Sequence, residues 1–394
     1  MDVRDVLALA ESQMTQILDD LGALVNIDSG TYTPRGVARV ADELERWLKA
    51  AGAEVERVAG SEFGPHLIAR WRGPGRGRAL LIGHMDTVFP EGEAERRPFR
   101  VADGRAYGPG VMDMKSGLLI GLYAARALLD EAPWAELVMF CNSDEEIGSP
   151  SSRSLVETLG KPAHAALVLE PNSRVDKTTI ARKGVATYRI DVEGLSAHAG
   201  VEPHRGRNAI LELAHRVIAV QALNGTIPGV TLNTGVTHGG ERPNVVPDAA
   251  HALVDVRAAD LEGVHVVDAA LRALADGPEH VEGTRTRLTG GFMHQPFVQS
   301  PASLRLFEMA QEVARELGYE LSGSPTGGGS DGNTTAATGA PTLDGLGAAG
   351  GMAHNPGEFI EVASIAPRIA LLSGIIQRLN VGGDQLRHHQ TGID

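Results

Sequence analysis

The chain has 394 residues, enough for about two ordinary domains, and 42% of them are hydrophobic, so it can form real cores. It contains 36 Lys and Arg residues and 50 Asp and Glu residues, and the resulting net charge of −14 disfavours binding to nucleic-acid phosphates or anionic membranes. Aromatic residues are few, no run approaches the roughly 20 apolar residues of a membrane helix, and the charged first residues do not resemble a signal peptide, so a cytoplasmic location is the default expectation.

The first informative element is a predicted strand that ends at His84. The preceding run, residues 81–83, is apolar and closes on a glycine, which is typical of a buried strand, and open α/β sheets bind ligands at the carboxyl ends of their strands. Asp86 follows two residues later, where its carboxylate can accept the second ring N–H of His84 and fix the tautomer. A lone His after a strand is more often structural, so the other residues decide its role.

A glycine-rich stretch, residues 107–117, comes next and opens a helix predicted from about residue 118 to 129. It contains Asp113, and the glycines leave bare backbone around that carboxylate, as a carboxylate placed between two cations requires. The alternative is that Asp113 merely caps the helix, which Asp does often without any metal.

The predicted strand 136–141 leads into three adjacent acids, Asp144, Glu145 and Glu146. Like charges this close repel one another, and a desolvated carboxylate is costly. A solvated acidic turn is the usual explanation of such a run. The two glutamates can instead divide two tasks, because Glu146 can bind a metal ion while Glu145 acts as general base.

Two more residues of metal-binding type follow. The predicted strand 165–169 ends at Glu170, and the following proline stops the strand there. His354 comes almost two hundred residues later, after a short predicted strand at 341–344. A site at the carboxyl edge of a sheet collects residues from many loops, so this separation in sequence is no objection.

These motifs resemble those of the di-zinc metallopeptidase family of glutamate carboxypeptidases, aminoacylases and succinyl-diaminopimelate desuccinylases. The resemblance rests on Gly-His-x-Asp-Thr-Val, Gly-Pro-Gly-x-x-Asp-Met-Lys-x-Gly, Asp-Glu-Glu-x-Gly-Ser, Glu-Pro and the late His, in that order. It implies an α/β fold: a zinc-peptidase-type three-layer catalytic domain with an inserted α+β sandwich that serves as lid and dimerisation domain.

The resemblance also implies two zinc ions. The positions matching His84, Asp113 and Glu170 hold one ion, and those matching Asp113, Glu146 and His354 hold the other, with Asp113 bridging. A ligand set this rich in carboxylates also accepts manganese or cobalt.

Three further expectations come from the resemblance. Glu145 is the general base, Asp86 is the carboxylate behind His84, and the peptide bond after Asp113 is cis.

The middle of the chain changes character, and we expect residues 183–294 to form the inserted domain, with 1–182 and 295–394 forming the catalytic domain. Strands are predicted at 184–192, 230–236, 250–256 and 284–288, with helices at 206–223 and 261–275. In the family this insertion is a lid whose edge strand and helix pair with those of a second subunit, which implies a homodimer.

Three residues of the insertion match positions of the family that line the cleft. His198 lies just past a strand among small residues, and its position donates to the developing oxyanion, generally from the neighbouring subunit. Asn244 and Arg257 match substrate-binding positions, and Arg257 can hold a carboxylate bidentately. An unused surface histidine and a surface ion pair are the ordinary alternatives for His198 and Arg257.

One departure from the family bears on the substrate. Relatives that release C-terminal glutamate tend to carry Arg-Pro on the strand returning from the lid, whereas this chain has Phe-Met-His-Gln-Pro at 292–296. The glycine-rich run 327–332 indicates bare backbone near the metals, with Asp331 in a loop or behind the ligands.

The sequence therefore predicts a metal-dependent amide hydrolase, an exo-acting carboxypeptidase or N-acyl-amino-acid deacylase, in which a di-zinc-bridged water attacks the scissile carbonyl of a short peptide or N-acyl amino acid and Glu145 is the base. Two alternatives remain open: hydrolysis of a non-peptide substrate such as an aryl amine, and a catalytically silent relative that only binds metal. The presence of Glu145 beside five ligands speaks against the silent relative.

Overall fold

The computed structural model describes residues 1–60 and 62–387. By their contacts, these residues divide into two compact units. The main unit comprises Met1–Ala181, Gln299–Thr326 and the chain from Ser330 onward, and the inserted unit comprises Arg182–Val298 with Gly327–Gly329. The domain boundaries expected at 182/183 and 294/295 stay a prediction.

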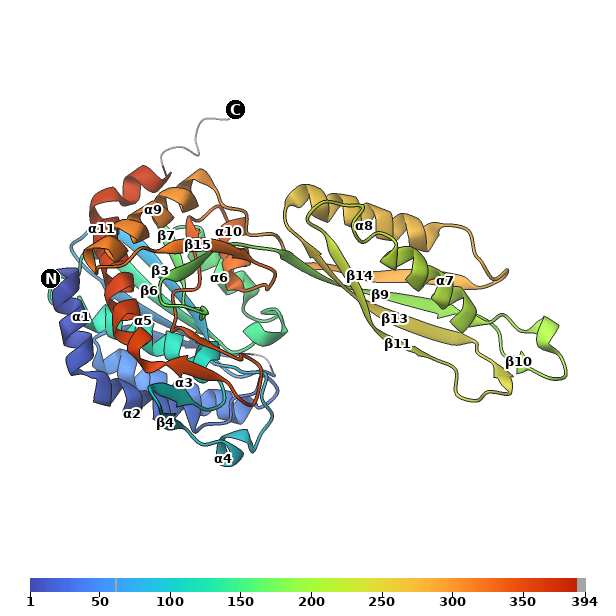
Figure 1. Ribbon diagram of the computed structural model, residues 1–394, viewed down its shortest axis with the longest axis horizontal. Coiled ribbons are helices and arrows are strands. Elements are labelled where there is room, and N and C mark those ends of the chain that lie inside the picture. The colour runs from blue at the N-terminus through green and yellow to red at the C-terminus, as the bar shows by residue number, and fades with distance from the viewer. Residues whose placement is uncertain (61, 388–394) are drawn as a thin grey trace. The chain divides into compact units, whose positions relative to one another are not determined.

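A six-stranded sheet forms the middle of the main unit (Figure 1). Strands β6, β3, β7 and β16 run parallel, and β2 and β1 continue the sheet antiparallel at the β6 side. In spatial order the strands are β1 (Glu54–Val58), β2 (His66–Arg72), β6 (Trp134–Asn142), β3 (Gly77–His84), β7 (Ala165–Val168) and β16 (Thr342–Leu343).

Helices cover both faces of this sheet. Successive residues of a strand point to opposite faces, and apolar residues on both faces need to be buried. Leu80 and Ile82 join the core beneath α6, while Leu81 joins the larger core on the opposite face. The expected three-layer α/β architecture is confirmed. The helices are α1 (Val3–Ser12), α2 (Met14–Val25), α3 (Pro34–Ala50), α4 (Glu93–Arg96), α5 (Ser116–Ala127), α6 (Arg153–Gly160), α9 (Pro301–Glu316), α10 (Asp331–Ala337) and α11 (Ile365–Arg387).

Helix α11 is the one helix among the described residues that is long and apolar enough to cross a membrane. The qualifying stretch is Val362–Leu379, and 72% of it is buried within the protein. It packs on α1, α5, α9 and strand β3, as the central helix of a core does. The expected cytoplasmic location stays a prediction.

Two smaller sheets complete the main unit. One contains β17 (Gly350–Gly351), β18 (Phe359–Glu361), β5 (Arg105–Tyr107) and β4 (Arg100–Ala102), all antiparallel. The other pairs β15 (Ser322–Thr326) with β8 (Lys177–Arg182). The first of these sheets joins segments that are about 250 residues apart in sequence.

The inserted unit is a four-stranded antiparallel sheet with two helices, α7 (Ala209–Gln221) and α8 (Leu261–Asp276), and its hydrophobic core lies between the helices and the sheet. Burial alternates along β13, as expected for a sheet with one covered face. The predicted helices and strands are all present, and the last strand runs six residues further than predicted, to His294. In spatial order the strands are β11 (Thr231–Gly239), β13 (Ala249–Ala258), β9 (Gly184–Glu193) and β14 (Arg285–His294), and β10 (Ala197–His198) pairs separately with β12 (Val245–Val246).

A buried ion pair holds the end of α8 against α7. Arg216 Nε donates to Glu212 Oε1 at 2.7 Å, and the other guanidinium nitrogens donate to carbonyl oxygens of Leu274, Gly277 and Pro278. Glu212 Oε2 accepts the N–H groups of His280 and Val281. Both side chains are almost completely buried, so each charge depends on the other for compensation.

Replacing Glu212 with Ala should destabilise the protein by about 3 kcal/mol, because it leaves the Arg216 charge buried and unpaired. Urea unfolding followed by circular dichroism measures the loss, and Glu241→Ala, an exposed position of the same unit, should change the stability by less than about 0.5 kcal/mol. A loss no larger than that of the control would contradict the role of the pair.

The loss should also depend on pH. Burial alone would raise the pKa of Glu212, but the N–H groups of Val281 and His280 and the Arg216 guanidinium outweigh it and lower the pKa below its ordinary value of 4.5. The contribution of Glu212 is therefore fully present above that ordinary value and is lost as the pH falls through the lower pKa of the folded state.

Candidate active site

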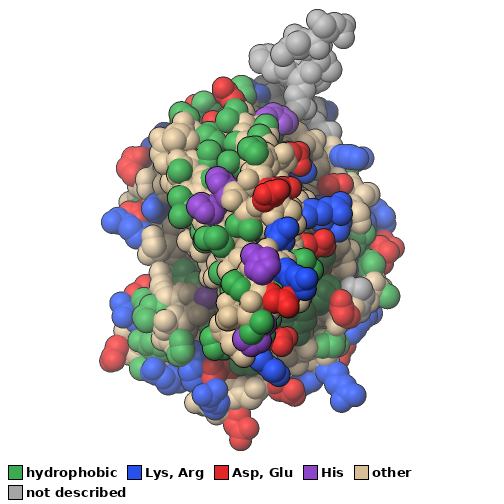
Figure 2. All heavy atoms as spheres, turned by 90° about the vertical axis from the view of Figure 1, so that its right-hand side faces the viewer, with side chains coloured by type: hydrophobic (Ala, Val, Ile, Leu, Met, Phe, Trp, Pro, Cys, Tyr) green, Lys and Arg blue, Asp and Glu red, His purple; other side chains and the backbone are tan. Residues whose placement is uncertain are grey.

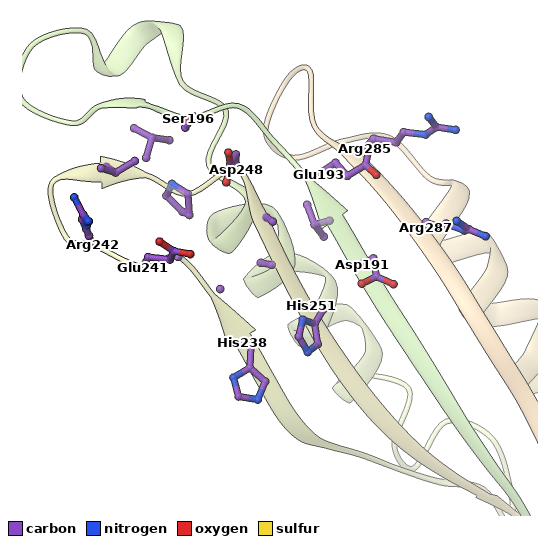
Figure 3. Close-up of a pocket in the computed structure, with 18 of the residues that line it drawn as sticks. Asp191, Glu193, Ser196, His238, Glu241, Arg242, Asp248, His251, Arg285 and Arg287 are labelled. Atoms are coloured by element: carbon purple, nitrogen blue, oxygen red, sulfur yellow. The ribbon is translucent and has the colours of Figure 1, made fainter.

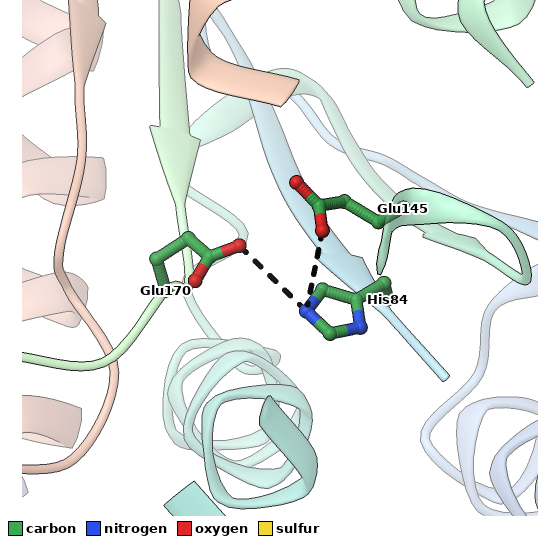
Figure 4. A group of neighbouring side chains, drawn as sticks. All are labelled: His84, Glu145 and Glu170. Carbon is green, nitrogen blue, oxygen red and sulfur yellow. Dashed lines mark ion pairs between the residues drawn. The ribbon is translucent and has the colours of Figure 1, made fainter. Parts of the chain in front are cut away.

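Three neighbouring parallel strands bring acidic and imidazole side chains to one edge of the main sheet. Strand β3 ends at His84, β6 leads into the short helix Glu145–Ile147, and Glu170 follows β7 by two residues. His84 is almost completely buried, and its Nε2 lies 3.7 Å from Glu170 Oε1 and 4.0 Å from Glu145 Oε2 (Figure 4). The carboxyl ends of β6, β3 and β7 thus meet where open α/β sheets bind ligands.

Asp113 lies between two histidines. Its Oδ1 is 3.1 Å from His84 Nε2, and its Oδ2 is 3.1 Å from His354 Nε2. Helix α5 begins at Ser116, so Asp113 does not cap it, and the helix-cap explanation of this residue is wrong. The peptide bond after Asp113 is cis, as the resemblance implied.

His354 comes from the turn between β17 and β18. Its backbone has a φ of +63°, in the left-handed region that non-glycine residues seldom adopt. Its Nε2 is 3.3 Å from Glu146 Oε2, so the ring lies between Asp113 and Glu146. A backbone conformation of this kind is typical of functional sites, where the surroundings hold it.

The electrostatics show how much negative charge this cluster confines. Burial raises the pKa of Glu145 well above its ordinary value, with the charge of Glu170 adding to it, and burial likewise raises the pKa of Glu146. Hydrogen bonds with Asp113 and Glu146 raise the pKa of His354 to about 10. The cluster therefore favours any added positive charge. Protons can supply that charge, but a protonated histidine has no lone pair left to bind a metal ion.

The residues fit a pair of divalent cations. Two N or O ligands at about 2.0–2.2 Å from one tetrahedral zinc stand roughly 3.4 Å apart, close to the separations of Asp113, His84, His354 and Glu146. Oε1 of Glu146 is buried and has no hydrogen-bond partner among the described residues. A buried carboxylate oxygen requires a partner unless it binds an ion. Two groups of three ligand atoms lie within 4.8 Å of one another: His84, Glu145 and Glu170, and His84, Asp113 and Glu146.

Asp86 lies directly behind this cluster and is completely buried. His84 Nδ1 is 2.9 Å from the backbone carbonyl oxygen of Asp86 and 3.5 Å from its Oδ1, so the carbonyl is the nearer acceptor. The carboxylate accepts the hydroxyl of Thr31 and the N–H groups of Glu145 and Glu146. Asp86 therefore holds the backbone of both glutamates as well as lying beside His84.

Asp144 and Asp331 are two more buried carboxylates at the acidic loop. Asp331, the first residue of α10, accepts from Asn142 Nδ2 and Ser149 Oγ, both at 2.6 Å, and these two residues flank the loop that carries the glutamates. Asp144 accepts the hydroxyls of the two serines at 151 and 152. The loop is thus bound at both ends, and a solvated acidic turn is excluded as its explanation.

The other predicted site residues belong to the inserted unit. His198 is exposed, and its Nδ1 accepts the N–H of Gly200, which leaves the proton of a neutral ring on Nε2. The carbonyl oxygen of Asn244 accepts the N–H of Ala199, so Asn244 lies beside His198. Arg257, near the other end of β13, donates from Nε and Nη2 to Asp255. Gly328 and Gly329 also belong to this unit, where Arg182 donates to their carbonyl oxygens.

The inserted unit has a hollow of about 920 Å³ on the open face of its sheet (Figure 3). The register places His238, His251, Asp191 and Arg287 in one row across the four strands. Its lining contains both acidic and basic side chains, and the face in Figure 2 likewise mixes both signs. Such a surface gives no single-sign field that would attract a polyanion.

Comparison with known proteins identifies the relatives of this chain. The model of the family described as Peptidase family M20/M25/M40 matches residues 80–378. Carboxypeptidase G2 of Pseudomonas sp. (strain RS-16) is 29% identical over 384 residues, which are 95% of this chain and 91% of that protein.

Solved structures share the fold. Aminopeptidase PepT from Bacillus cereus superposes with a TM-score of 0.77 at 24% identity, covering 93% of this chain and 98% of that one. The YXEP protein of Bacillus subtilis, described as a dinuclear metal binding peptidase of the M20 family, gives a TM-score of 0.70 at 15% identity, covering 94% and 99%.

Zinc added to the metal-free protein should raise its stability, by about 2.7 kcal/mol at a free concentration one hundred times the dissociation constant. Asp113→Asn should remove most of this gain, because Asp113 faces both histidines. Thermal denaturation with and without zinc measures the effect, and Asp176→Asn, at a surface ion pair, is the matched control. An Asp113→Asn variant that still bound two zinc ions with unchanged stabilisation would contradict the bridging position.

Proposed function

The chain belongs to the peptidase family M20/M25/M40 and is a metallopeptidase or amidohydrolase, and from that premise we propose that it hydrolyses the amide bond of short peptides or N-acyl amino acids with two metal ions. One observation carries this proposal. The two oxygens of Asp113 face two different histidines, at 3.1 Å each, with the carboxylate of Glu145 on the His84 side.

Two cations would share the bridging carboxylate. His84, Asp113 and Glu170 would hold one ion, and Asp113, Glu146 and His354 the other. Such ions lower the pKa of water and polarise a carbonyl. Zinc suits this mixture of imidazole and carboxylate ligands, and manganese or cobalt are the alternatives that the ligand set also accepts.

Glu145 is the residue proposed to move the proton. Its carboxylate is close to His84, where it can take and return a proton, and burial together with the charge of Glu170 raises its pKa. Glu145 would take a proton from the attacking water, hold it while the tetrahedral carbon forms, and deliver it to the leaving amine. Asp86 supports this step because it accepts the backbone N–H of Glu145.

The inserted unit is proposed to supply the remaining contacts with the substrate. The Nε2–H of His198 would donate to the oxyanion of the tetrahedral carbon, and Asn244 lies beside it. Arg257 would bind a substrate carboxylate through Nη1, the guanidinium nitrogen that has no hydrogen bond to Asp255. Asp255 would meanwhile keep the guanidinium in place.

Two copies of the chain are needed to complete one such site. His198 and Asn244 lie next to the start of β13, and Arg257 lies eight residues along that strand, roughly 26 Å away at the usual rise of a strand. A dipeptide spans only about 7 Å. His198 and Arg257 of one copy therefore cannot contact the same substrate, and we propose that His198 and Asn244 reach the substrate of a partner subunit.

The inserted unit also offers a surface for that partner. Helix α7 exposes Ile210, Leu211 and Ile218, and the neighbouring edge strand β11 exposes Val236. An exposed edge strand beside an apolar helix face suits pairing with a second copy. The proposed homodimer uses this helix and this edge.

The side-chain preference of the enzyme is proposed to differ from that of a strict glutamate carboxypeptidase. Strand β14 ends at His294 without the Arg-Pro that glutamate-releasing relatives tend to carry, and His294 is almost completely buried. An N-acyl-amino-acid deacylase or a carboxypeptidase with another preference fits this departure better.

Glu145→Gln should retain both metal ions and lose nearly all activity, because the amide keeps the shape of the side chain but takes up no proton. The assay follows amine released from a panel of N-acyl amino acids and dipeptides, with zinc, manganese or cobalt. Glu157→Gln, exposed on α6, is the matched control and should be fully active. Substantial turnover by Glu145→Gln would sink the assignment of the base, and no release by the wild type with two metals bound would point to another substrate class.

Mixing Glu145→Gln with His198→Ala should restore activity that neither variant has alone. In a mixed dimer one site combines an intact Glu145 with the partner's intact His198. Random exchange makes half of the dimers mixed, so about a quarter of the wild-type sites should be active if oxyanion stabilisation comes from the partner. No recovery after verified exchange of subunits would mean that His198 acts within its own chain.

A further inference from the structure

A buried glutamate that is not one of the proposed ligands holds the loop that carries Asp113. Glu358 is completely buried, and its Oε1 accepts the N–H of Met112 at 2.7 Å and the N–H of Asp113 at 3.0 Å. Its Oε2 accepts the N–H of Gly110 at 3.3 Å. One carboxylate thus binds three backbone N–H groups of a four-residue stretch.

The same glutamate is tied to His354. Glu358 is four residues beyond His354, and its own N–H closes the intervening turn by donating to the carbonyl oxygen of Asn355. Strand β18 begins directly after Glu358 and pairs with β5, which leads into the Asp113 loop, in the register Phe359 opposite Tyr107. The loop and the turn are therefore neighbours in the fold, and the side chain of Glu358 joins their backbones.

We propose that Glu358 is a positioning residue that sets Asp113 against His354, so that the carboxylate of Asp113 can bridge two metal ions. This inference rests on the proposed function, since it assigns Glu358 a task in the metal pair. Neither Asp113 nor His354 comes from the main sheet, so the parallel strands that place His84 and the glutamates do not place these two.

Glu358 can position Asp113 because its hydrogen bonds to the loop are strong and, within the described chain, the loop has no other partner for these N–H groups. Hydrogen bonds to an ionised acceptor are roughly twice as strong as neutral ones, and a buried N–H without a partner costs about 1–3 kcal/mol. Gly110 has a φ of +71°, and a Cβ there would lie 2.5 Å from Thr87, so the loop has little freedom to find other partners.

A buried lysine anchors the same segment at a second point. Lys115 is almost completely buried, and its Nζ donates to the carbonyl oxygen of Ile27 at 2.8 Å. It follows Asp113 by two residues on the same segment. The loop that carries Asp113 is therefore held by the carboxyl group of Glu358 at its N–H groups and by Lys115 at the carbonyl oxygen of Ile27.

The test compares Glu358→Gln with Glu361→Gln. Glutamine keeps the size of the side chain. In the variant, however, an NH2 group faces a backbone N–H that bonds to a carboxylate oxygen in the wild type. Glu361 lies three residues further on β18, is half-exposed and pairs with Arg105, so its variant should leave metal binding and activity unchanged. Metal-free samples of all three proteins are titrated with zinc for stoichiometry and affinity, and their thermal stability without metal is measured alongside.

For Glu358→Gln we expect zinc affinity to fall at least tenfold, the size of effect seen when a residue supporting metal ligands is removed. Turnover should fall with little change in KM and should recover in part at high zinc concentration. A residue that only stabilised the fold would lower the thermal stability of the metal-free protein without this recovery. Unchanged zinc affinity in Glu358→Gln would overturn the proposal.

Two outcomes keep this result separate from the proposed function. A wild-type protein that binds fewer than two zinc ions would refute the metal pair itself, whatever the variant does. If Glu358→Gln does not fold, Glu358→Asp carries the same titration, because it keeps the carboxylate one methylene short of the loop. Wild-type affinity in Glu358→Asp would then overturn the positioning role.

Discussion

The repulsion among crowded carboxylates is the constraint on which the rest of this structure depends. Asp113, Glu145, Glu146 and Glu170 converge on two histidines at a sheet edge where most of them are shielded from water. Confined charges of one sign destabilise a fold unless something positive or hydrogen-bonding meets them. The surrounding residues supply part of that compensation, and a metal pair would supply the rest.

Much of the surrounding architecture can be understood as support for these acids. Asp86 binds the N–H groups of two glutamates, Asp331 binds the residues on either side of their loop, and Glu358 binds the loop of Asp113. None of these three carboxylates is among the proposed ligands. Each converts a flexible connection into a fixed one through backbone or side-chain N–H and O–H donors, which is how a site on loops reaches the precision that catalysis needs.

The sequence could indicate the candidate ligand residues because each follows a strand or a glycine-rich turn that is visible in the pattern, and their binding of metal stays a prediction. The buried run before His84 and the strand before Glu170 are local signals, and both lie where the periodicity placed them. The four strands of the insertion can also be predicted from the sequence. One face of their sheet is covered, so apolar and polar residues alternate along the strands.

Other features had no local signal. Glu358 acts on residues about 245 positions away, and Asp331 on residues about 180–190 away, so only the folded chain reveals their partners. The glycines before Asp331 favour a loop residue or one behind the ligands, and in the structure Asp331 is the first residue of α10. The nearer acceptor of His84 Nδ1 is a backbone carbonyl, which a sequence motif does not distinguish from the carboxylate of the same residue.

The pairing of β18 with β5 has a consequence for the order in which this protein matures. The candidate ligands begin at His84 and end at His354, and the last of them is placed by a strand pair that closes about 250 residues of chain. Contacts this distant in sequence form late, because the entropy of closing a long loop must be overcome first. A ribosome-bound chain that has emerged only to residue 340 would have four of the five ligands and no complete site. Metal loading would therefore report on completion of the fold, because a chain that ends before His354 lacks both a proposed ligand and the core helix α11.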